Sequence, residues 1–290
     1  AFFDKFQSVI VDETHGAKSS SIKSCLQKCT NAEYRIGLTG TMPESKADKF
    51  TIYGFLGPKL YGIESSELIK RNILSKITIA NILLEYSEED KFKYWHSDDG
   101  KISKISYKEE LELIYKNKDR NNVFKYIINN IDKKENILIL CHKIDHLKDV
   151  ESYLKENFKG YNIHTIYGKT EADEREAIRK TTNLTESNII IGTYSTMSTG
   201  INIKRLHHVI FASSYKSKIK ILQSIGRGLR KHDSKDKLIL WDIVDDLTWT
   251  SNRGKKYKNF VYIHWRQRLQ YYESQSFKFL NKKFNFIKYC

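Results

Sequence analysis

Cysteine is scarce in this sequence, and long apolar stretches are missing from it. Cys25, Cys29, Cys141 and Cys290 are too few and too scattered over 290 residues to form a disulfide framework, which favours a reducing compartment. Cys25 and Cys29 lie four residues apart, but no second pair has the spacing of a zinc site. No run is apolar and long enough to cross a membrane, and no secretory pattern opens the chain. We therefore expect a cytoplasmic protein without a membrane partner.

Acidic residues are outnumbered, most of all near the end of the chain. Fifty Lys and Arg against 35 Asp and Glu give a net charge of +15 and a pI near 9.4. Residues 251–290 hold ten basic residues and one acidic residue, Glu273, so nine of the fifteen net positive charges lie there. This imbalance suits a polyanionic partner such as nucleic acid. A hydrophobic content of 40% is sufficient for globular cores, and the length allows two domains.

A complete phosphate-binding loop is also missing. Gly168-Lys169-Thr170 resembles the end of such a loop, but Ile163 stands where the loop needs a glycine so that the backbone can curl around phosphate. We interpret these residues as a plain turn.

The strongest local signal is the run Val9-Ile10-Val11 followed directly by Asp12 and Glu13. Consecutive β-branched residues without alternation predict a strand buried on both faces of a parallel sheet. Ligands of such sheets bind beyond the carboxyl ends of the strands. One carboxylate there can hold Mg²⁺ through its water shell, while the next orients or deprotonates an attacking water. The alternative is that Asp12 only caps the following helix.

Strand and helix patterns alternate along the rest of the chain, which predicts parallel α/β sheets. The expected strands cover residues 34–38, 76–86, 137–140, 163–166, 189–191, 208–211 and 238–241. The expected helices cover residues 21–28, 121–132, 145–158, 171–180 and 218–230. Because the chain opens abruptly, without Met, we expect it to begin inside a domain.

We therefore predict four segments. Residues 1–86 form the C-terminal part of a first domain, 87–118 a linker or hairpin, 119–250 a complete second domain and 251–290 a basic, aromatic, helical extension.

Two polar stretches follow buried strands of the second domain. Gly192–Asn202 offers hydroxyl and backbone N–H groups for phosphates. Gln223–Arg230 falls on a predicted helix, where Arg227 and Arg230 are three residues apart and share one face. Two adjacent guanidinium groups suit the negative charge of a transferring phosphoryl group.

These motifs together resemble a known family. Asp12–His15, Thr39–Thr41, Ser198–Asn202 and Gln223–Arg230, in this order, look like motifs II, III, V and VI of the superfamily-two DExH-box helicases. Further stretches within 206–246 resemble the phage UvsW-type recombination helicases. The resemblance implies RecA-like parallel sheets, with the end of the first helicase domain and the whole second one. It also implies ATP and Mg²⁺ as cofactors, in a bacterial or phage-infected host cell.

The resemblance assigns roles in the first domain. Asp12 would coordinate Mg²⁺ through water, and Glu13 would be the catalytic base. His15 would couple the nucleotide site to the interdomain cleft, with Thr39 and Thr41 as a relay.

In the second domain, Arg227 and Arg230 would be arginine fingers, with Arg230 the better candidate for the γ-phosphate. Gly200 and Asn202 would lie near the nucleotide, although many relatives have Asp at the second position. Gln223 would share the coupling role.

Nucleic-acid contacts are expected from Thr193, by resemblance, and from the basic extension. In that extension Trp265, Leu269 and Tyr272, then Phe277, Leu280, Phe284 and Ile287, recur at helical spacing and predict helix faces packed on the second domain. The side chains left for phosphates are Lys255, Lys256, Lys258, Arg266 and Arg268.

The expected function is that of the C-terminal portion of an ATP-dependent DNA helicase or translocase that remodels branched or forked DNA in recombination and replication, without sequence preference. An RNA–DNA hybrid is a further candidate substrate. The family's G-x-G-K-[ST] loop lies upstream of the DExH box and is absent from this chain, so we expect it to bind ATP poorly and not to hydrolyse it alone. The alternatives are a restriction-system translocase subunit and an ATP-independent nucleic-acid-binding fragment.

Overall fold

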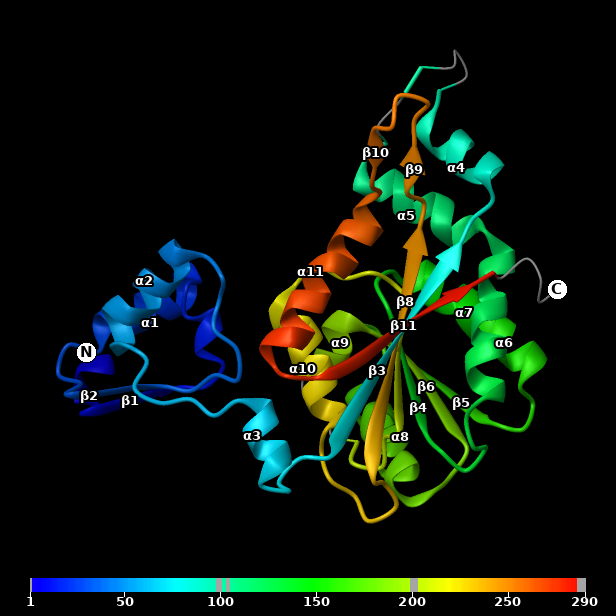
Figure 1. Cartoon of the computed structure of the whole chain (residues 1–290). Helices are drawn as coiled ribbons and strands as arrows, with labels where there is room; N and C mark the ends of the chain where they lie inside the picture. The colour runs from blue at the N-terminus through cyan, green and yellow to red at the C-terminus, as the bar shows by residue number, and fades with distance from the viewer. Residues whose placement is uncertain (1, 98–100, 103–104, 199–202, 286–290) are drawn as a thin grey trace. The chain divides into compact units, whose positions relative to one another are not determined.

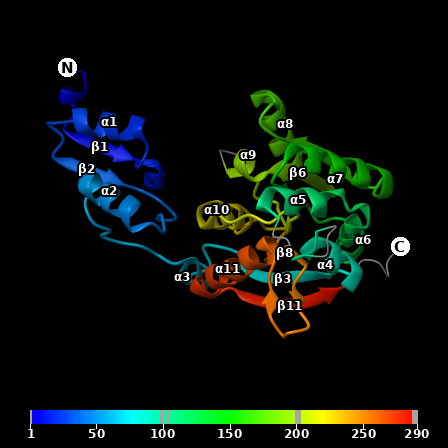
Figure 2. The ribbon, with the colours of Figure 1, turned by 90° about the horizontal axis from the view of Figure 1, so that it is seen from above.

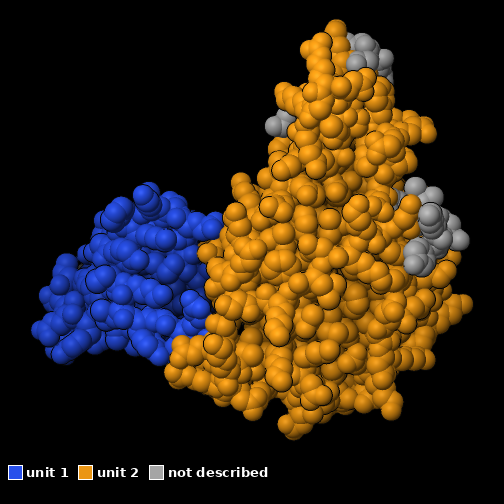
Figure 3. Space-filling view, viewed as in Figure 1, with its two compact units in different colours: residues 1–64 blue, residues 65–290 orange. Residues whose placement is uncertain are grey.

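The computed structural model describes residues 2–97, 101–102, 105–198 and 203–285. The chain forms two compact units, unit 1 (residues 1–64) and unit 2 (residues 65–290), which are coloured separately in Figure 3. Each unit has its own hydrophobic core.

Unit 1 is built on two parallel strands, β1 (Ser8–Val11) and β2 (Tyr34–Gly37). Helices α1 (Ser20–Lys28) and α2 (Lys46–Leu56) supply Leu26 and Ile52 to a small core, against which Val9 and Val11 pack. Short 3-10 turns at Phe3–Lys5 and Thr14–Gly16 flank β1.

The prediction that β1 is buried on both faces is wrong for the part of the chain that the structure describes. Successive side chains of a strand point to opposite faces. Val9 and Val11 therefore face the helices, whereas Ile10 points away from them and is 65% exposed. Its neighbour in the register, Ile36, is also exposed.

Unit 2 is a seven-stranded sheet in which every pair of neighbouring strands is parallel, in the order β11-β3-β8-β7-β4-β6-β5 (Figure 1). The strands are β3 (Lys76–Glu85), β4 (Ile137–Cys141), β5 (Asn162–Ile166), β6 (Asn188–Thr193), β7 (His208–Phe211), β8 (Lys237–Asp246) and β11 (Lys278–Phe284). A short antiparallel hairpin, β9 (Trp249–Thr250) and β10 (Lys256–Tyr257), follows β8.

Helices cover both faces of this sheet, as parallel sheets require. They are α3 (Ser65–Lys70), α4 (Glu88–Trp95), α5 (Tyr107–Lys116), α6 (Asn122–Asn129), α7 (Ile144–Asn157), α8 (Ala172–Leu184), α9 (Tyr194–Ser198), α10 (Lys218–Gly228) and α11 (Phe260–Ser274), with a 3-10 turn at Lys118–Asn121. One core lies under α5, α6 and α7, and the other under α9, α10 and α11. Figure 2 shows α10 and α11 on one side of the sheet and α6 and α7 on the other. Within the described residues, no helix is long and apolar enough to span a membrane.

The last predicted segment differs most from expectation. Trp265, Leu269 and Tyr272 are buried on α11 as expected, but the helical spacing of the following aromatics was misleading, since Phe284 ends strand β11. β11 pairs with β3 over seven residues. This pairing satisfies the backbone N–H and C=O groups on the side of β3 that faces away from β8. Ile287 lies outside the described residues.

The compact units also differ from the predicted segments. β3 was assigned to the first domain, but it pairs with β8 along ten residues, so residues 65–86 belong to unit 2. Residues 87–118, expected to be a linker or hairpin, contain helices α4 and α5. The described residues 251–285 are part of the unit 2 sheet and its cover and do not form a separate extension.

Candidate functional site

The two carboxylates Asp12 and Glu13 stand at the carboxyl end of β1, and both are exposed. Asp12 Oδ1 accepts the Glu13 N–H at 2.8 Å, and it does not cap the turn that follows, whose N-cap is Glu13. Glu13 has φ 48°, in the left-handed region, where a side chain costs about 1 kcal/mol. Thr14 holds this bend, because its backbone N–H donates to the Leu38 carbonyl at 2.9 Å.

A chain of polar contacts links Glu13 to the segment after β2. His15 Nδ1 lies 3.2 Å from Glu13 Oε2 and 3.2 Å from Thr39 Oγ1. The Thr39 hydroxyl donates to the Thr41 carbonyl at 3.1 Å and accepts the Thr41 N–H at 3.3 Å. The fold thus brings together four of the residues selected from the sequence, although 24 positions separate His15 from Thr39.

In this geometry the Glu13 carboxylate is accessible to solvent and can accept a proton. The imidazole beside Glu13 is held by Thr39, so it can steady the carboxylate without covering it. No cluster of three or more metal-ligating side chains occurs among the described residues. A single carboxylate such as Asp12 suits Mg²⁺ that keeps most of its water ligands.

The arginine pair differs from its predicted arrangement. α10 ends at Gly228, so Arg227 lies in its last turn, whereas Arg230 lies beyond the helix in a β-bridge with Leu74. The expectation that both arginines share a helix face is therefore wrong. The bridge to Leu74 draws the chain into an extended conformation at Arg230, and Ser75 N–H donates to the Leu229 carbonyl at 2.8 Å.

Other motif residues lie around the same sheet. Gln223 is half-buried on α10. Thr193 ends β6 and is buried, with its Oγ1 2.8 Å from Thr196 Oγ1 and accepting the Thr196 N–H at 3.3 Å. Gly200 and Asn202 lie outside the described residues. Gly168 and Lys169 form the predicted turn, closed by Thr170 N–H donating to the Tyr167 carbonyl at 3.0 Å.

The predicted phosphate-binding cations separate into two groups. Lys255, Lys256, Lys258 and Arg266 are exposed. Arg268 is 1% exposed and donates from Nε and Nη2 to the two carboxylate oxygens of Asp242, each at 2.8 Å. The structure contradicts a phosphate contact by Arg268, because α11 turns this side chain into the core.

Sequence reasoning missed Arg253, which is exposed in the loop between β9 and β10. It lies in the same basic run as Lys255, so the local charge density already marked it. We omitted Arg253 because we expected this run to form a helix, whereas it forms the hairpin of β9 and β10.

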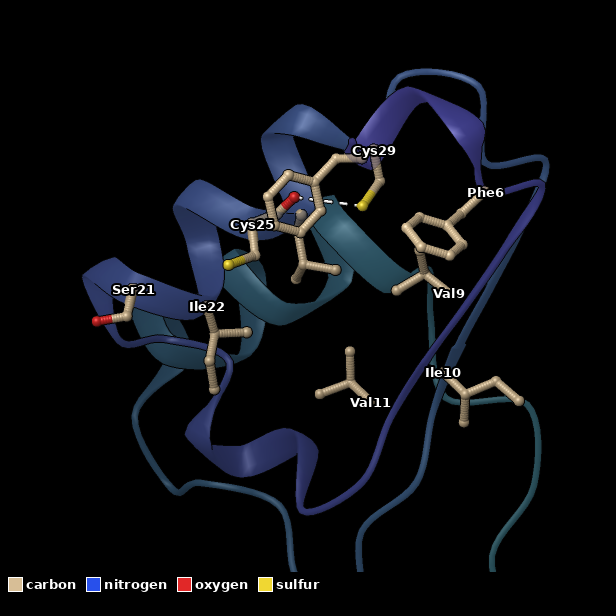
Figure 4. A pocket seen from close by; sticks show the side chains of 10 residues that line it. Phe6, Val9, Ile10, Val11, Ser21, Ile22, Cys25 and Cys29 are labelled. Atoms are coloured by element: carbon tan, nitrogen blue, oxygen red, sulfur yellow. Dashed lines mark hydrogen bonds between the residues drawn. The ribbon is translucent and has the colours of Figure 1, made fainter. Parts of the chain in front are cut away.

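The apolar pocket of unit 1 is separate from the carboxylates. It has a volume of about 360 Å³ and is lined mainly by Phe3, Phe6, Val9, Ile22 and Leu26 (Figure 4). Two cysteines also line it, and the Cys29 thiol donates to the Cys25 carbonyl at 3.3 Å instead of facing a metal.

The comparisons with known proteins concern the sequence and the fold of this chain. Residues 119–232 match the family described as the helicase conserved C-terminal domain. The ATP-dependent DNA helicase UvsW of Enterobacteria phage T4 is 30% identical over 98% of this chain and 56% of its own length. The crystal structure of T4 UvsW superposes with a TM-score of 0.60 at 28% identity, covering 98% of this chain and 55% of that one.

A second structural likeness concerns the fold alone. The fragment structure of a putative HsdR subunit of a type I restriction enzyme from Vibrio vulnificus YJ016 gives a TM-score of 0.61 at 17% identity, covering 83% of this chain and 44% of that one. The chain spans little more than half the length of UvsW.

Proposed function

This chain is a superfamily-two helicase-family protein that resembles UvsW along nearly its whole length, and on that premise we propose that it is the C-terminal portion of an ATP-dependent DNA helicase or translocase. We further propose that this enzyme remodels branched or forked DNA during recombination and replication, without sequence preference, in the cytoplasm of a bacterial or phage-infected cell. An RNA–DNA hybrid is a second candidate substrate.

The observation that supports this proposal most is the contact of Glu13 with His15 and of His15 with Thr39. Motif residues that are distant in sequence meet at the carboxyl end of a parallel strand, where nucleotide sites of α/β sheets lie. A surface carboxylate whose only role is to keep the protein soluble would not need a neighbouring imidazole held in one orientation.

The proposed roles follow from this arrangement. Glu13 positions a water and accepts its proton, while His15 and the Thr39 hydroxyl hold the carboxylate in place. Asp12 holds Mg²⁺ through water. When bound, ATP with Mg²⁺ supplies the phosphoryl group whose hydrolysis drives movement.

The second unit supplies charge and contacts. Arg227 and Arg230 are proposed to neutralise charge on the phosphates, each from its own backbone segment. Gly200 and Asn202 are proposed to bind near the nucleotide, and Gln223 is proposed to share the coupling role of His15.

Nucleic acid is proposed to contact Thr193 and the exposed cations Lys255, Lys256, Lys258 and Arg266. These groups reach backbone phosphates and carry no base information, so binding should be steeply sensitive to salt.

The two alternatives stay open for separate reasons. The HsdR likeness concerns the fold alone, so it does not select a restriction-system translocase subunit. An ATP-independent nucleic-acid-binding fragment would keep the cations but would need neither Glu13 nor Asp12.

The test measures ATP hydrolysis and DNA binding in the same samples, with and without forked DNA. Glu13→Gln is compared with Glu33→Gln, which changes an exposed carboxylate of the same unit outside the His15 contact. We expect the chain to bind DNA without turnover, because positioning of the phosphates is most of the catalysis. In a longer protein that carries a G-x-G-K-[ST] loop, Glu13→Gln should lower kcat by about 10²–10⁴-fold and Glu33→Gln should not.

Failure to bind DNA would contradict the proposed function. Turnover that survives Glu13→Gln would contradict the role of Glu13. Turnover by this chain that Glu13→Gln abolishes would keep that role but would show the expected inactivity to be wrong.

A further inference from the structure

One concentrated basic surface lies on the hairpin that follows β8. We define the basic hairpin as residues 249–258, with β9, β10 and the loop between them. Arg253, Lys255, Lys256 and Lys258 are all exposed, and none forms an ion pair with a described residue. No acidic residue occurs between 247 and 272 in the sequence. Four cations within six residues therefore create a concentrated positive charge that no ion pair with a described residue neutralises.

The aromatic side chains of the hairpin point toward the protein. The Tyr257 ring lies 5.5 Å from Trp95 and 5.6 Å from Trp249, between ring centroids, and Trp249 packs edge-on against His96 at 4.7 Å. Trp95 is buried, and its Nε1 donates to the Leu247 carbonyl at 2.7 Å. These rings brace the hairpin against the end of α4, and Trp249 and Tyr257 are half-buried there rather than offered as stacking surfaces.

A buried carboxylate fixes both ends of the hairpin. Glu110 of α5 is fully buried and accepts hydrogen bonds from Asn259 Nδ2 at 2.9 Å, Phe260 N at 2.9 Å and Val261 N at 2.8 Å. Asn259 Oδ1 in turn accepts the Leu247 N–H at 3.1 Å, across the base of the hairpin. The hairpin is thus held in place before any ligand arrives, which lowers the entropic cost of binding through it.

The position of the hairpin suits a ligand that passes along one edge of the sheet. It leaves from the carboxyl end of β8, and Thr193 lies at the carboxyl end of β6. Because all seven strands are parallel, these two ends lie at the same edge. Figure 1 shows β9 and β10 projecting beyond the ends of β8 and β3.

We propose that the basic hairpin is a preformed arm that binds the phosphodiester backbone of nucleic acid through its four cations, without stacking on bases. The proposal rests on the proposed function, which makes nucleic acid the polyanion concerned. Lys and Arg contacts to phosphates position a nucleic acid and carry no sequence information, so the arm should hold duplex and single strands alike.

The experiment compares two variants of the full chain that lose the same charge. The hairpin variant carries R253Q, K255Q, K256Q and K258Q, and the control carries K125Q, K133Q, K134Q and K159Q at exposed positions on α6 and in loops. Fluorescence anisotropy measures binding to a blunt duplex and to a single strand of mixed sequence, between 50 and 200 mM salt, on samples with matching unfolding transitions.

We expect the hairpin variant to bind both ligands at least about tenfold more weakly than the unchanged chain, with the slope of log K against log salt about 3 to 4 shallower on duplex. The control should stay within about twofold on each ligand, because long-range fields are screened beyond roughly 10 Å.

Other results would overturn the proposal in distinct ways. Equal losses in the hairpin variant and the control would mean that only net charge matters. A loss confined to the single strand would mean that base stacking and not phosphate contact is involved. If the unchanged chain bound neither ligand, the proposed function would fail first, which separates that failure from one of the hairpin alone.

Discussion

Replacing Arg268 by alanine should destabilise unit 2 by about 3–5 kcal/mol, because it leaves a buried charge without its partner. Asp242 is fully buried in β8, and both its carboxylate oxygens accept from Arg268 at 2.8 Å. Once the guanidinium is removed, the Tyr272 hydroxyl, which donates to the carboxylate at 2.8 Å, is the one side-chain donor left to it among the described residues. The Ser214 hydroxyl also loses a donor, Nη1 of Arg268 at 3.0 Å.

Two further variants separate the cost of the unpaired Asp242 charge from the cost of lost side-chain packing. Arg268→Met keeps most of the side-chain volume but also leaves Asp242 uncompensated, so it should be nearly as damaging as Arg268→Ala. The double variant with Asp242→Asn removes the buried charge as well and should recover part of the loss.

Arg266→Ala is the matched control, since Arg266 is exposed on the same helix two positions away. It should change stability by less than about 0.5 kcal/mol and weaken DNA binding. Urea unfolding followed by tryptophan fluorescence gives the free energy of unfolding, and anisotropy on the folded samples gives the affinity.

The reasoning would be refuted if Arg268→Ala left the unfolding midpoint unchanged while weakening DNA binding as much as Arg266→Ala. That result would place Arg268 among the phosphate contacts, as its position in the sequence first suggested.

Two further predictions concern pH and packing. Burial, with Arg268 and Lys216 nearby, lowers the pKa of His264 to about 4, so the folded chain excludes a proton that the unfolded chain binds below about pH 6.5. Stability should therefore fall as pH falls from about 6.5 to about 4, by about 2–3 kcal/mol from this group. His264→Phe should reduce that slope in unfolding measurements across the range, and an unchanged slope would show that His264 stays protonatable in the fold. Gly228→Ala should destabilise the chain by about 1–3 kcal/mol, because the added Cβ would lie 2.6 Å from Leu238 Cδ2. Gly226→Ala, with open space at the same helix end, is its control in thermal unfolding, and equal effects of the two changes would contradict this packing argument.

Local patterns predicted much of the fold. The apolar runs at 137–141, 189–193 and 208–211 are strands of a parallel sheet, buried on both faces, because alternating helices cover them. The motif II and III residues His15 and Thr39 lie in contact, because helix α1 and strand β2 between them return the chain to the carboxyl end of β1.

What the patterns did not predict depends on partners far along the chain. In a short aromatic run, helical spacing and strand alternation can select the same residues. The pattern around Phe284 therefore predicted a helix, whereas the pairing of β11 with β3 makes this segment a strand. The end of α10 likewise depends on Leu74, which lies more than 150 residues before Arg230.

The sequence by itself determined the family motifs, the alternation of strands and helices and the excess of positive charge, because these are properties of residues and their near neighbours. Only the tertiary structure decided which cations are available. Arg266 and Arg268 are the same residue type on one helix, and only the proximity of Asp242, from a strand 26 positions away, makes one a core ion pair and leaves the other exposed to solvent.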